Sequence, residues 1–197
     1  MATAARSYHH GNLRAALLEG AERMLAERGV DGLSLRELAR EVGVSHAAPR
    51  RHFADRQALL DALAAQGFAD LRERLAAAAA GGADFAARFG ALARAYVAFA
   101  TEHAALLELM FARKHRPDAA ALRDAADAAF AVPLEVLSAG VAMGELDGED
   151  PERTATLVFA ALQGMAALVN GALVEPEDLD AAVDGLVLQL LRGLTPR

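Results

Sequence analysis

One stretch of this sequence collects basic side chains and excludes acidic ones. No carboxylate occurs between Glu41 and Asp55. The basic and imidazole side chains in this interval are His46, Arg50, Arg51 and His52. Phosphate oxygens and the negative potential of a DNA groove attract such a stretch, and a carboxylate inside it would oppose docking. The composition favours a nucleic-acid-binding surface; the alternative is a solvated segment that lacks acids by chance.

The stretch lies within residues 34–53, which read SLRELAREVGVSHAAPRRHF. Ser34 and Glu37 have the spacing of a capping box, in which the serine side chain accepts from the Glu37 N–H and the glutamate reaches back. This pair opens a short helix that ends at residues 41–43. Gly43 allows the left-handed backbone of a tight turn. Two short helices joined by such a turn indicate a helix-turn-helix motif.

The second helix of the motif follows Ser45, whose hydroxyl is suited to an N-cap. Pro49 has no N–H and disfavours helical backbone at Ala48. A helix capped by Ser45 would therefore lose a hydrogen bond at Pro49. A start one or two residues later places the proline in the first turn, and we expect this later start.

Helical spacing of apolar residues continues along the chain, and runs of alternating β-branched residues are absent. The sequence predicts an all-α fold of about nine helices, with an N-terminal three-helix helix-turn-helix domain and a C-terminal helical domain. We place the DNA-binding domain at residues 8–56, a connecting helix at 57–80, and the C-terminal helical domain at 81–197. The N-caps expected for later helices are Asp55, Asp84 and Asp150.

Charge divides the chain in the same way. Residues 1–56 carry a net charge of +2 and residues 57–197 a net charge of −9, for a total of −7. A mildly basic module on an acidic chain is typical of a small nucleic-acid-binding domain joined to another function. The absence of cysteine excludes disulfides, thiol catalysis and cysteine-ligated metal sites. Charged residues within the first 30 positions argue against a secretory signal, so we expect a cytoplasmic protein.

Residues 157–174 form a run of 18 residues without a charge. A membrane span is one interpretation, because this length reaches the lower limit for crossing a bilayer. Alanines, two glycines and an amide pair, with acidic segments on both sides, favour a core or dimer helix instead. Since one small module reads few base pairs, specificity requires two copies. We expect a homodimer through the last two helices, at about 151–174 and 177–193, and no membrane partner.

Over residues 8–71 the chain resembles the DNA-binding domain of the TetR/AcrR family of transcriptional regulators. The matching segments are Tyr8–Arg14, Leu35–Ser45, His52-Phe53 and Leu59-Leu60. Residues 45–49 are similar to the branch whose C-terminal part is a WHG-type ligand domain. That likeness continues at Tyr96–Ala100, His103, Leu109–Phe111 and Phe159–Gly164. Phe159 and Gln163 stand where this branch often has tryptophan and histidine.

The resemblance assigns DNA-binding roles to the motif and its flanks. The residues that would face the DNA are Arg36, Ser45, His46, Ala47, Ala48, Arg50 and His52. Ser34 and Arg56 would hold phosphates. Arg36 is the candidate for a bidentate guanine contact, and a phosphate contact is the alternative. The family usually has tyrosine where this chain has Arg50, and an arginine can contact the same phosphate with more charge.

The resemblance also makes residues 81–197 a ligand-binding and dimerisation domain, with an effector pocket between residues 83 and 148. The residues assigned to the ligand are Phe89, Tyr96, Phe99, His103, Met110, Phe111 and Gln163, with Phe85 and Phe130 as further candidates. These side chains suit an apolar or aromatic effector, and plain core packing is the alternative role for each. The implied function is a DNA-binding repressor, double-stranded DNA being its partner, that a small molecule releases from a palindromic operator.

Other classes of protein fit the sequence less well. We find no convincing paired carboxylates, phosphate loop, Ser/His/Asp set or metal-ligand spacing, so we predict no catalytic residue, metal site or cofactor. His9 and His10 are adjacent and would point apart on a helix. A helical small-molecule-binding protein, or an enzyme without a DNA-reading role, is the alternative. A helical adaptor would leave the capping box and the acid-free stretch unexplained.

Overall fold

The structure is a computed structural model that describes residues 13–147 and 150–194, and within these ranges it contains helices and no strand. The α-helices are α1 (Leu13–Arg28), α2 (Leu35–Val42), α3 (Arg56–Ala80), α4 (Phe85–Glu102), α5 (Ala104–Lys114), α6 (Ala120–Ala142), α7 (Pro151–Asn170) and α8 (Leu179–Leu194). Short 3-10 helices lie at Val30–Gly32, Pro49–Arg51 and Pro176–Asp178. The all-α prediction is confirmed, with eight α-helices in the described ranges.

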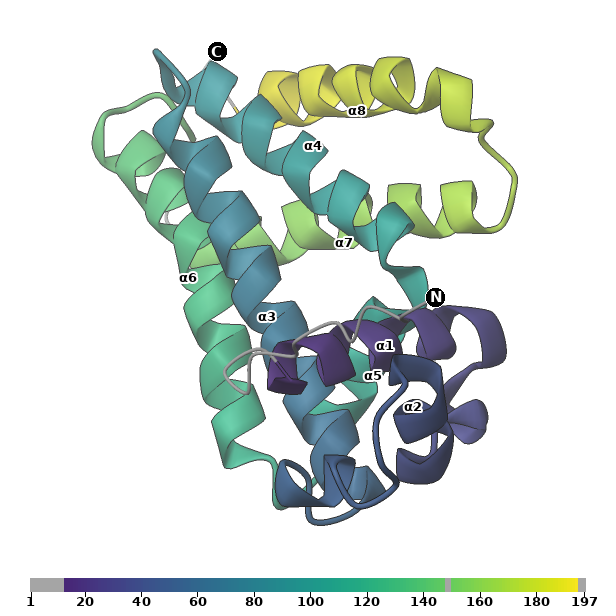
Figure 1. The fold of residues 1–197 in the computed structure, drawn as a ribbon. Helices are drawn as coiled ribbons and strands as arrows, with labels where there is room; N and C mark the ends of the chain where they lie inside the picture. Colours follow the sequence, from purple (N-terminus) through teal and green to yellow (C-terminus); the bar gives the residue numbers. More distant parts are fainter. Residues whose placement is uncertain (1–12, 148–149, 195–197) are drawn as a thin grey trace.

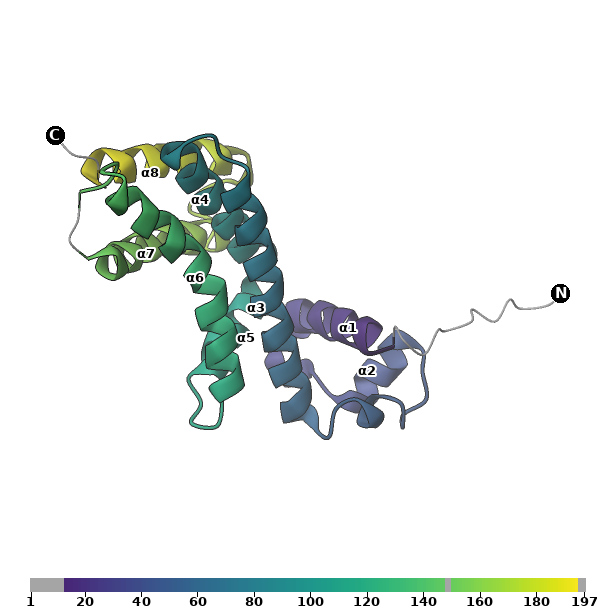
Figure 2. The same cartoon turned by 90° about the vertical axis from the view of Figure 1, so that its left-hand side faces the viewer.

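α3 is the long central helix of the molecule, and the other helices pack near its two ends (Figures 1 and 2). α6 runs beside α3, and this pair forms the most extensive helix contact. Near the start of α3, α1 packs on α3 and α2 packs on α1. α4, α7 and α8 lie together near the other end. One helix therefore joins the head, which we define as residues 13–55, to the larger helical domain.

Aspartates begin three of the long helices, as the sequence predicts. The carboxylates of Asp55, Asp84 and Asp150 each accept a hydrogen bond from the backbone N–H three residues later, at 2.8, 2.8 and 3.1 Å. Each bond satisfies an amide that has no partner within the first helical turn. The predicted starts of α3, α4 and α7 are thus confirmed.

The head depends on a close approach between α1 and α2. A Cβ atom at Gly20 of α1 would come within 2.8 Å of Val42 and 3.1 Å of Leu38, both on α2. The apolar core beneath these helices continues into α3 and the larger domain as one cluster. Its most buried side chains in this region include Leu17, Met24, Leu38, Phe53 and Leu59. The head is therefore held to α3 by shared packing.

A sharp bend of 96° separates α4 from α5 at His103. The sequence predicts the break at residues 116–118, but no glycine or proline marks this earlier bend. Beyond the bend, α5 packs against both α3 and α1. Met110 of α5 lies so close to Gly67 of α3 that a Cβ there would stand 2.6 Å from the methionine sulfur. The bend thus places α5 between α3 and the head.

By length and composition, α6 is the one single helix in the described ranges that could cross a membrane. It packs against α3, α4, α5 and α7. The uncharged run at residues 157–174 lies in α7 and the turn that follows it.

Candidate functional sites

Both ends of α2 are fixed by the residues that the sequence indicates. The Ser34 hydroxyl accepts a hydrogen bond from the Glu37 N–H at 3.1 Å. The Glu37 carboxylate does not return this bond; it lies 3.4 Å from Arg40 and 3.5 Å from Arg28. Gly43 ends the helix in the left-handed region, with φ at 74°. The predicted serine cap and glycine turn are confirmed, and the second half of the capping box is replaced by ion pairs.

The element that follows the turn differs from the predicted α-helix. Residues 46–48 form a turn, and Pro49–Arg51 form a single 3-10 turn whose N-cap position is Ala48. No side chain caps it, and Ser45, whose cap is the less favoured start expected from the sequence, lies three residues before the N-cap position. Pro49 has no N–H to donate to the Ser45 carbonyl, and the Ala48 N–H takes that acceptor instead at 2.9 Å. The expected later start is confirmed in direction: the helix begins three residues later instead of one or two, and the proline occupies its first position.

Most of the predicted DNA-facing side chains are exposed at the tip of the head. We call tip surface the set formed by Arg36, Ser45, His46, Ala47, Arg50 and His52, all of which are exposed. Ala48 and Ser34 are half-buried beside it. Within the described ranges, Arg36 and Arg50 form no salt bridge, whereas Arg28 and Arg40 pair with glutamates. The tip surface therefore carries positive charge that the head itself does not neutralise.

Arg56 stands at the first position of α3 and turns back toward the head. Its Nε donates to the Leu33 carbonyl at 2.7 Å, and a terminal nitrogen donates to the Val30 carbonyl at 2.6 Å. The Asp31 carboxylate lies 3.8 Å away. These contacts fasten the start of α3 to the loop between α1 and α2. Arg56 thus has a structural role, and its phosphate contact remains a prediction.

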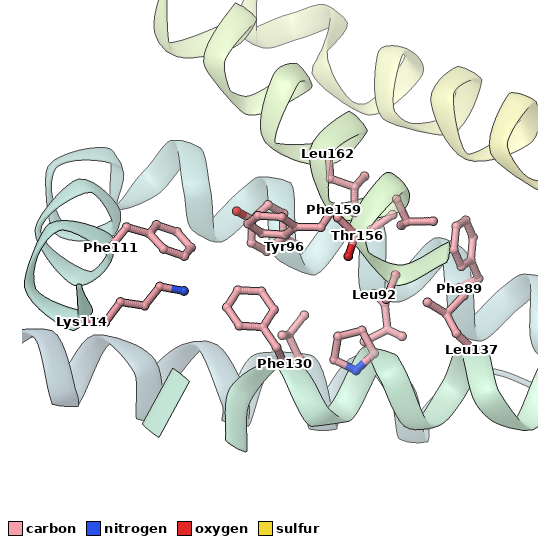
Figure 3. A pocket seen from close by; sticks show the side chains of 15 residues that line it. Phe89, Leu92, Tyr96, Phe111, Lys114, Phe130, Leu137, Thr156, Phe159 and Leu162 are labelled. Carbon is pink, nitrogen blue, oxygen red and sulfur yellow. The ribbon is translucent and has the colours of Figure 1, made fainter. Parts of the chain in front are cut away.

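A cavity of about 290 Å³ lies among α3, α4, α5, α6 and α7 (Figure 3). Of the residues that the sequence assigned to a ligand, Phe89, Tyr96 and Phe111 line it, together with the further candidate Phe130. The remaining lining residues are Leu75, Leu92, Ala93, Lys114, Pro133, Leu137, Ala155, Thr156, Val158, Phe159 and Leu162. A mostly apolar lining with few polar groups is typical of a small-molecule site.

Aromatic rings from four helices meet around Phe159 of α7. Its ring centre lies 5.2 Å from that of Phe130, 5.4 Å from that of Tyr96 and 6.0 Å from that of Phe111. The Tyr96 hydroxyl donates a hydrogen bond to the side-chain oxygen of Gln163. Burial raises the pKa of Tyr96 well above its ordinary value, because the ionised form would lose its hydration. Gln163 is therefore fixed behind the lining by a neutral tyrosine and is not itself a lining residue.

The other predicted ligand residues lie outside the cavity lining. Phe99 is buried, and its ring centre lies 4.9 Å from that of His103. His103 stands at the bend, with Nδ1 2.6 Å from a carboxylate oxygen of Glu22 on α1. Met110 is buried against α3. These three side chains connect helices, and Phe85 likewise packs in the core, stacked on Phe89.

Sequence reasoning missed Lys114, the one charged side chain among those lining the cavity. Lys114 follows Phe111 by three positions, and side chains with this spacing share one face of a helix. Once Phe111 is predicted to face a pocket, this spacing predicts that Lys114 faces the same pocket. Phe159 and Leu162 have the same spacing on α7 and both line the cavity.

α7 and the turn and helix that follow it leave several large apolar side chains exposed. The exposed fractions of Leu157, Leu168, Leu173 and Leu188 are 60, 42, 76 and 47%. Gln163 and Asn170, the amide pair of the uncharged run, turn toward other helices of the same chain. Gln163 accepts from Tyr96, and the Asn170 side chain donates to the Ala100 carbonyl at 3.2 Å. The exposed apolar side chains of this part of the chain are thus leucines, while both amides are engaged within the chain.

Within the described ranges, no group of three or more histidine, aspartate or glutamate side chains is placed to hold a metal ion. The acidic and imidazole groups near the bend are paired with protein groups: Glu102 lies 2.7 Å from Arg74, and His103 contacts Glu22. His9 and His10 lie outside the described residues.

A helix-turn-helix head that shares one core with a helical domain containing an apolar cavity defines a class of bacterial DNA-binding regulators. Two family models match the chain: residues 17–63 match bacterial regulatory proteins of the tetR family, and residues 89–190 match the tetracyclin repressor-like C-terminal domain. The second match alone covers more than half of the chain. The protein therefore belongs to the TetR family; its assignment to the WHG-type branch stays a prediction.

Solved structures share the fold along nearly the whole chain. A protein of unknown function from Rhodococcus sp. RHA1 is 44% identical, with a TM-score of 0.88 over 98% of this chain and 100% of that one. The ketosteroid regulator KstR2 of Mycobacterium tuberculosis is 20% identical, with a TM-score of 0.70 over 93% and 95%. FadR from Bacillus subtilis, solved in complex with stearoyl-CoA, is 15% identical, with a TM-score of 0.75 over 91% and 98%. The last two show a shared fold alone.

Among curated proteins, the transcriptional repressor AcnR of Corynebacterium diphtheriae is 41% identical over 63 residues. The aligned part covers 32% of this chain and 33% of AcnR. The AcnR of Corynebacterium efficiens matches similarly, at 38% over 65 residues. The chain thus matches about a third of the length of these curated relatives.

Proposed function

We propose that this protein is a transcriptional repressor that binds a palindromic DNA operator as a homodimer and releases it when a small apolar molecule enters the cavity. The observation that carries the proposal is the tip surface, where Arg36 of α2 and Arg50 of the 3-10 turn beyond Gly43 are exposed and have no salt bridge within the described ranges. Membership of the TetR family and the likeness to a repressor at the N-terminal part support it. We infer a soluble, cytoplasmic protein, since its DNA is there.

In this proposal the tip surface enters the major groove. Arg50, His46 and His52 approach the phosphates and base edges, and Ala47 and Ala48 offer apolar contact to a thymine methyl group. Arg36 either reads a guanine or holds a phosphate. The DNA-binding set is completed by Ser34 and Ser45, whose hydroxyls lie at the borders of the surface, and by Arg56.

The operator is read by two heads, and the exposed leucines of α7 and α8 offer the surface that joins them. Their exposure of 42 to 60% leaves apolar area in contact with water, which a second copy of the chain would cover. A dimer with two-fold symmetry presents its heads to half-sites about one helical turn, or roughly 34 Å, apart. The operator is then expected to be palindromic.

Ligand control requires that the cavity and the head share a moving part, and α5 is placed to be that part. Phe111 and Lys114 of α5 line the cavity, while the same helix packs against α1 of the head. At the start of α5, His103 contacts Glu22 of α1. A ligand that binds two arrangements of α5 unequally would shift the spacing of the heads and lower the affinity for the operator.

Selection of bound duplexes from a random DNA pool, repeated at two salt concentrations, tests the proposal. We expect a palindromic consensus at both concentrations, with affinity that falls as salt rises. Binding without sequence preference would contradict it and favour the alternative, a helical small-molecule-binding protein or an enzyme. Molar mass in solution, measured on the same sample, checks that the DNA-binding species is a dimer.

A further inference from the structure

The one charged side chain that lines the cavity, Lys114, is also the one lysine in the sequence. The chain contains 20 cationic side chains of lysine and arginine, and Lys114 is the only lysine among them. An arginine stays charged in all protein settings, whereas a lysine carries a compact point charge on a flexible stem and is more costly to dehydrate. This one lysine stands at one end of the cavity beside Phe111, and Phe89 and Leu137 lie at the other end (Figure 3).

The Lys114 ammonium group has aromatic neighbours and, among the residues that the structure describes, no anion bonded to it. Nζ lies 4.6 Å from the ring centre of Phe111 and 5.9 Å from that of Phe130, both within cation–π range. Within the described ranges the group forms no hydrogen bond or salt bridge. Burial lowers the pKa of Lys114, and the negative charge of Asp127 on α6 acts in the opposite direction. The cation is thus partly dehydrated without a bonded partner.

The other polar groups of the lining are already engaged. The Tyr96 hydroxyl donates to Gln163, and the Thr156 hydroxyl donates to the Glu152 carbonyl of its own helix at 2.9 Å. The remaining lining residues are apolar. A ligand that fills this cavity therefore meets one available charge at one end and hydrocarbon along the rest.

We propose that Lys114 binds the carboxylate headgroup of an otherwise apolar ligand, whose chain extends toward Phe89 and Leu137. The inference rests on the proposed function, in which this cavity holds the effector, and it narrows the effector from apolar to an apolar carboxylate. The ion pair with a carboxylate provides a charge-assisted hydrogen bond, which the ammonium does not form with any described residue. The apolar chain is removed from water against the aromatic and aliphatic lining.

Laurate and lauramide are matched probes for this test, because they share one chain and differ in headgroup charge. Since the chain has one lysine, isotope-labelled lysine gives one side-chain signal in NMR spectra, which reports directly on Lys114. We expect laurate to shift this signal to saturation and lauramide to shift it little. Laurate binding without a change in the signal would overturn the proposal, as would failure of laurate to bind.

Variants then separate charge from packing. In Lys114→Met, laurate affinity is expected to fall about tenfold to a hundredfold while lauramide affinity stays the same. Lys114→Arg keeps the charge and should recover most of the loss. Arg72→Met removes a charge from an exposed position of α3 outside the lining and should leave laurate affinity unchanged. Equal loss of both probes in Lys114→Met would assign the lysine to packing and overturn the proposal.

Separate experiments test the carboxylate site at Lys114 and the proposed DNA-binding function. Lauroyl-CoA, whose acyl carbonyl carries no charge, is a second arm: if it loses affinity in Lys114→Met and laurate does not, the carboxylate assignment is wrong. The DNA selection uses the wild-type protein without ligand. A palindromic consensus without Lys114-dependent laurate binding would leave the regulator standing, and the reverse result would leave the carboxylate site standing without a DNA role.

Discussion

The head and the cavity place positive charge in opposite ways. At the tip of the head, Arg36 and Arg50 are exposed, remain hydrated and have no acidic partner in the described structure. In the cavity, Lys114 is half-buried between aromatic rings. Exposed charges cost little to keep and attract a polyanion over a distance, whereas a dehydrated charge is costly and selects a ligand that brings one anion. The two regions thus suit a macromolecule and a small molecule respectively.

The largest effect is expected from a carboxylate placed in the tip surface. Arg50→Glu should lower DNA affinity about a hundredfold or more, because it replaces an attraction to phosphate with a repulsion. Titration of the selected operator by fluorescence anisotropy measures this loss. Arg72→Glu changes the net charge by the same amount at an exposed site on α3 and serves as the control. Similar losses in both variants would mean that total charge, not the tip surface, governs binding.

Arg36→Ala distinguishes the two roles left open for that side chain. If Arg36 reads a guanine, the variant should lose about 1–3 kcal/mol of the binding free-energy difference between the preferred base pair and the others at one operator position. The preference for particular base pairs at the remaining positions should not change. If it holds a phosphate, affinity should fall on all sequences alike, and the salt dependence should become shallower. Binding measured against single-base variants of the operator, at two salt concentrations, separates the outcomes.

Gly43→Ala tests whether the head needs the left-handed turn. No heavy atom would lie within 4 Å of an added Cβ at Gly43, so the cost comes from its positive φ alone. We expect about 1–2 kcal/mol of lost stability, measured by chemical denaturation. Gly81→Ala is the matched control, since Gly81 ends α3 with φ at −89° and its nearest contact would be 3.8 Å. Equal effects in the two variants would contradict the expectation.

The smallest effect concerns Tyr96 at high pH. Burial raises its pKa in the folded protein, while an unfolded tyrosine titrates near about 10. The tyrosine therefore favours folding fully below about pH 10 and progressively less above it, because only the unfolded chain then releases the proton. Denaturation at rising pH in a Tyr8→Phe background, where Tyr96 is the one remaining tyrosine, measures this loss. Tyr96→Phe should abolish the extra pH dependence, and its persistence would assign the effect to other groups.

Local signals predicted the fold well where one side chain sets one backbone feature. Ser34, Asp55 and Asp150 each cap the helix that the sequence assigned to them, and Gly43 has the expected left-handed backbone. These features depend on groups within three or four positions, so the sequence contains all of the necessary information.

Structural features that depend on packing between residues far apart in the chain were harder to predict from the sequence. The bend at His103 has no glycine or proline signal and is stabilised by contacts such as that with Glu22, 81 positions away. Phe99 and Met110 were assigned to a ligand pocket because they are apolar, as are the neighbouring side chains that do line the cavity. The assignment did not distinguish the helix face toward the cavity from the faces toward other helices. Which face meets a cavity and which meets α3 follows from the bend, and a single sequence shows neither.

The position of Lys114 has a practical consequence for anyone who handles this protein. Acylating dyes, amine-directed crosslinkers and coupling to activated sensor chips all target side-chain amines, and this chain has one. Any such reagent that reacts with that side chain modifies the cavity itself, so a sensor surface prepared through it would obstruct the compartment under study. Attachment through an engineered thiol avoids the problem, because the native chain has no cysteine to compete.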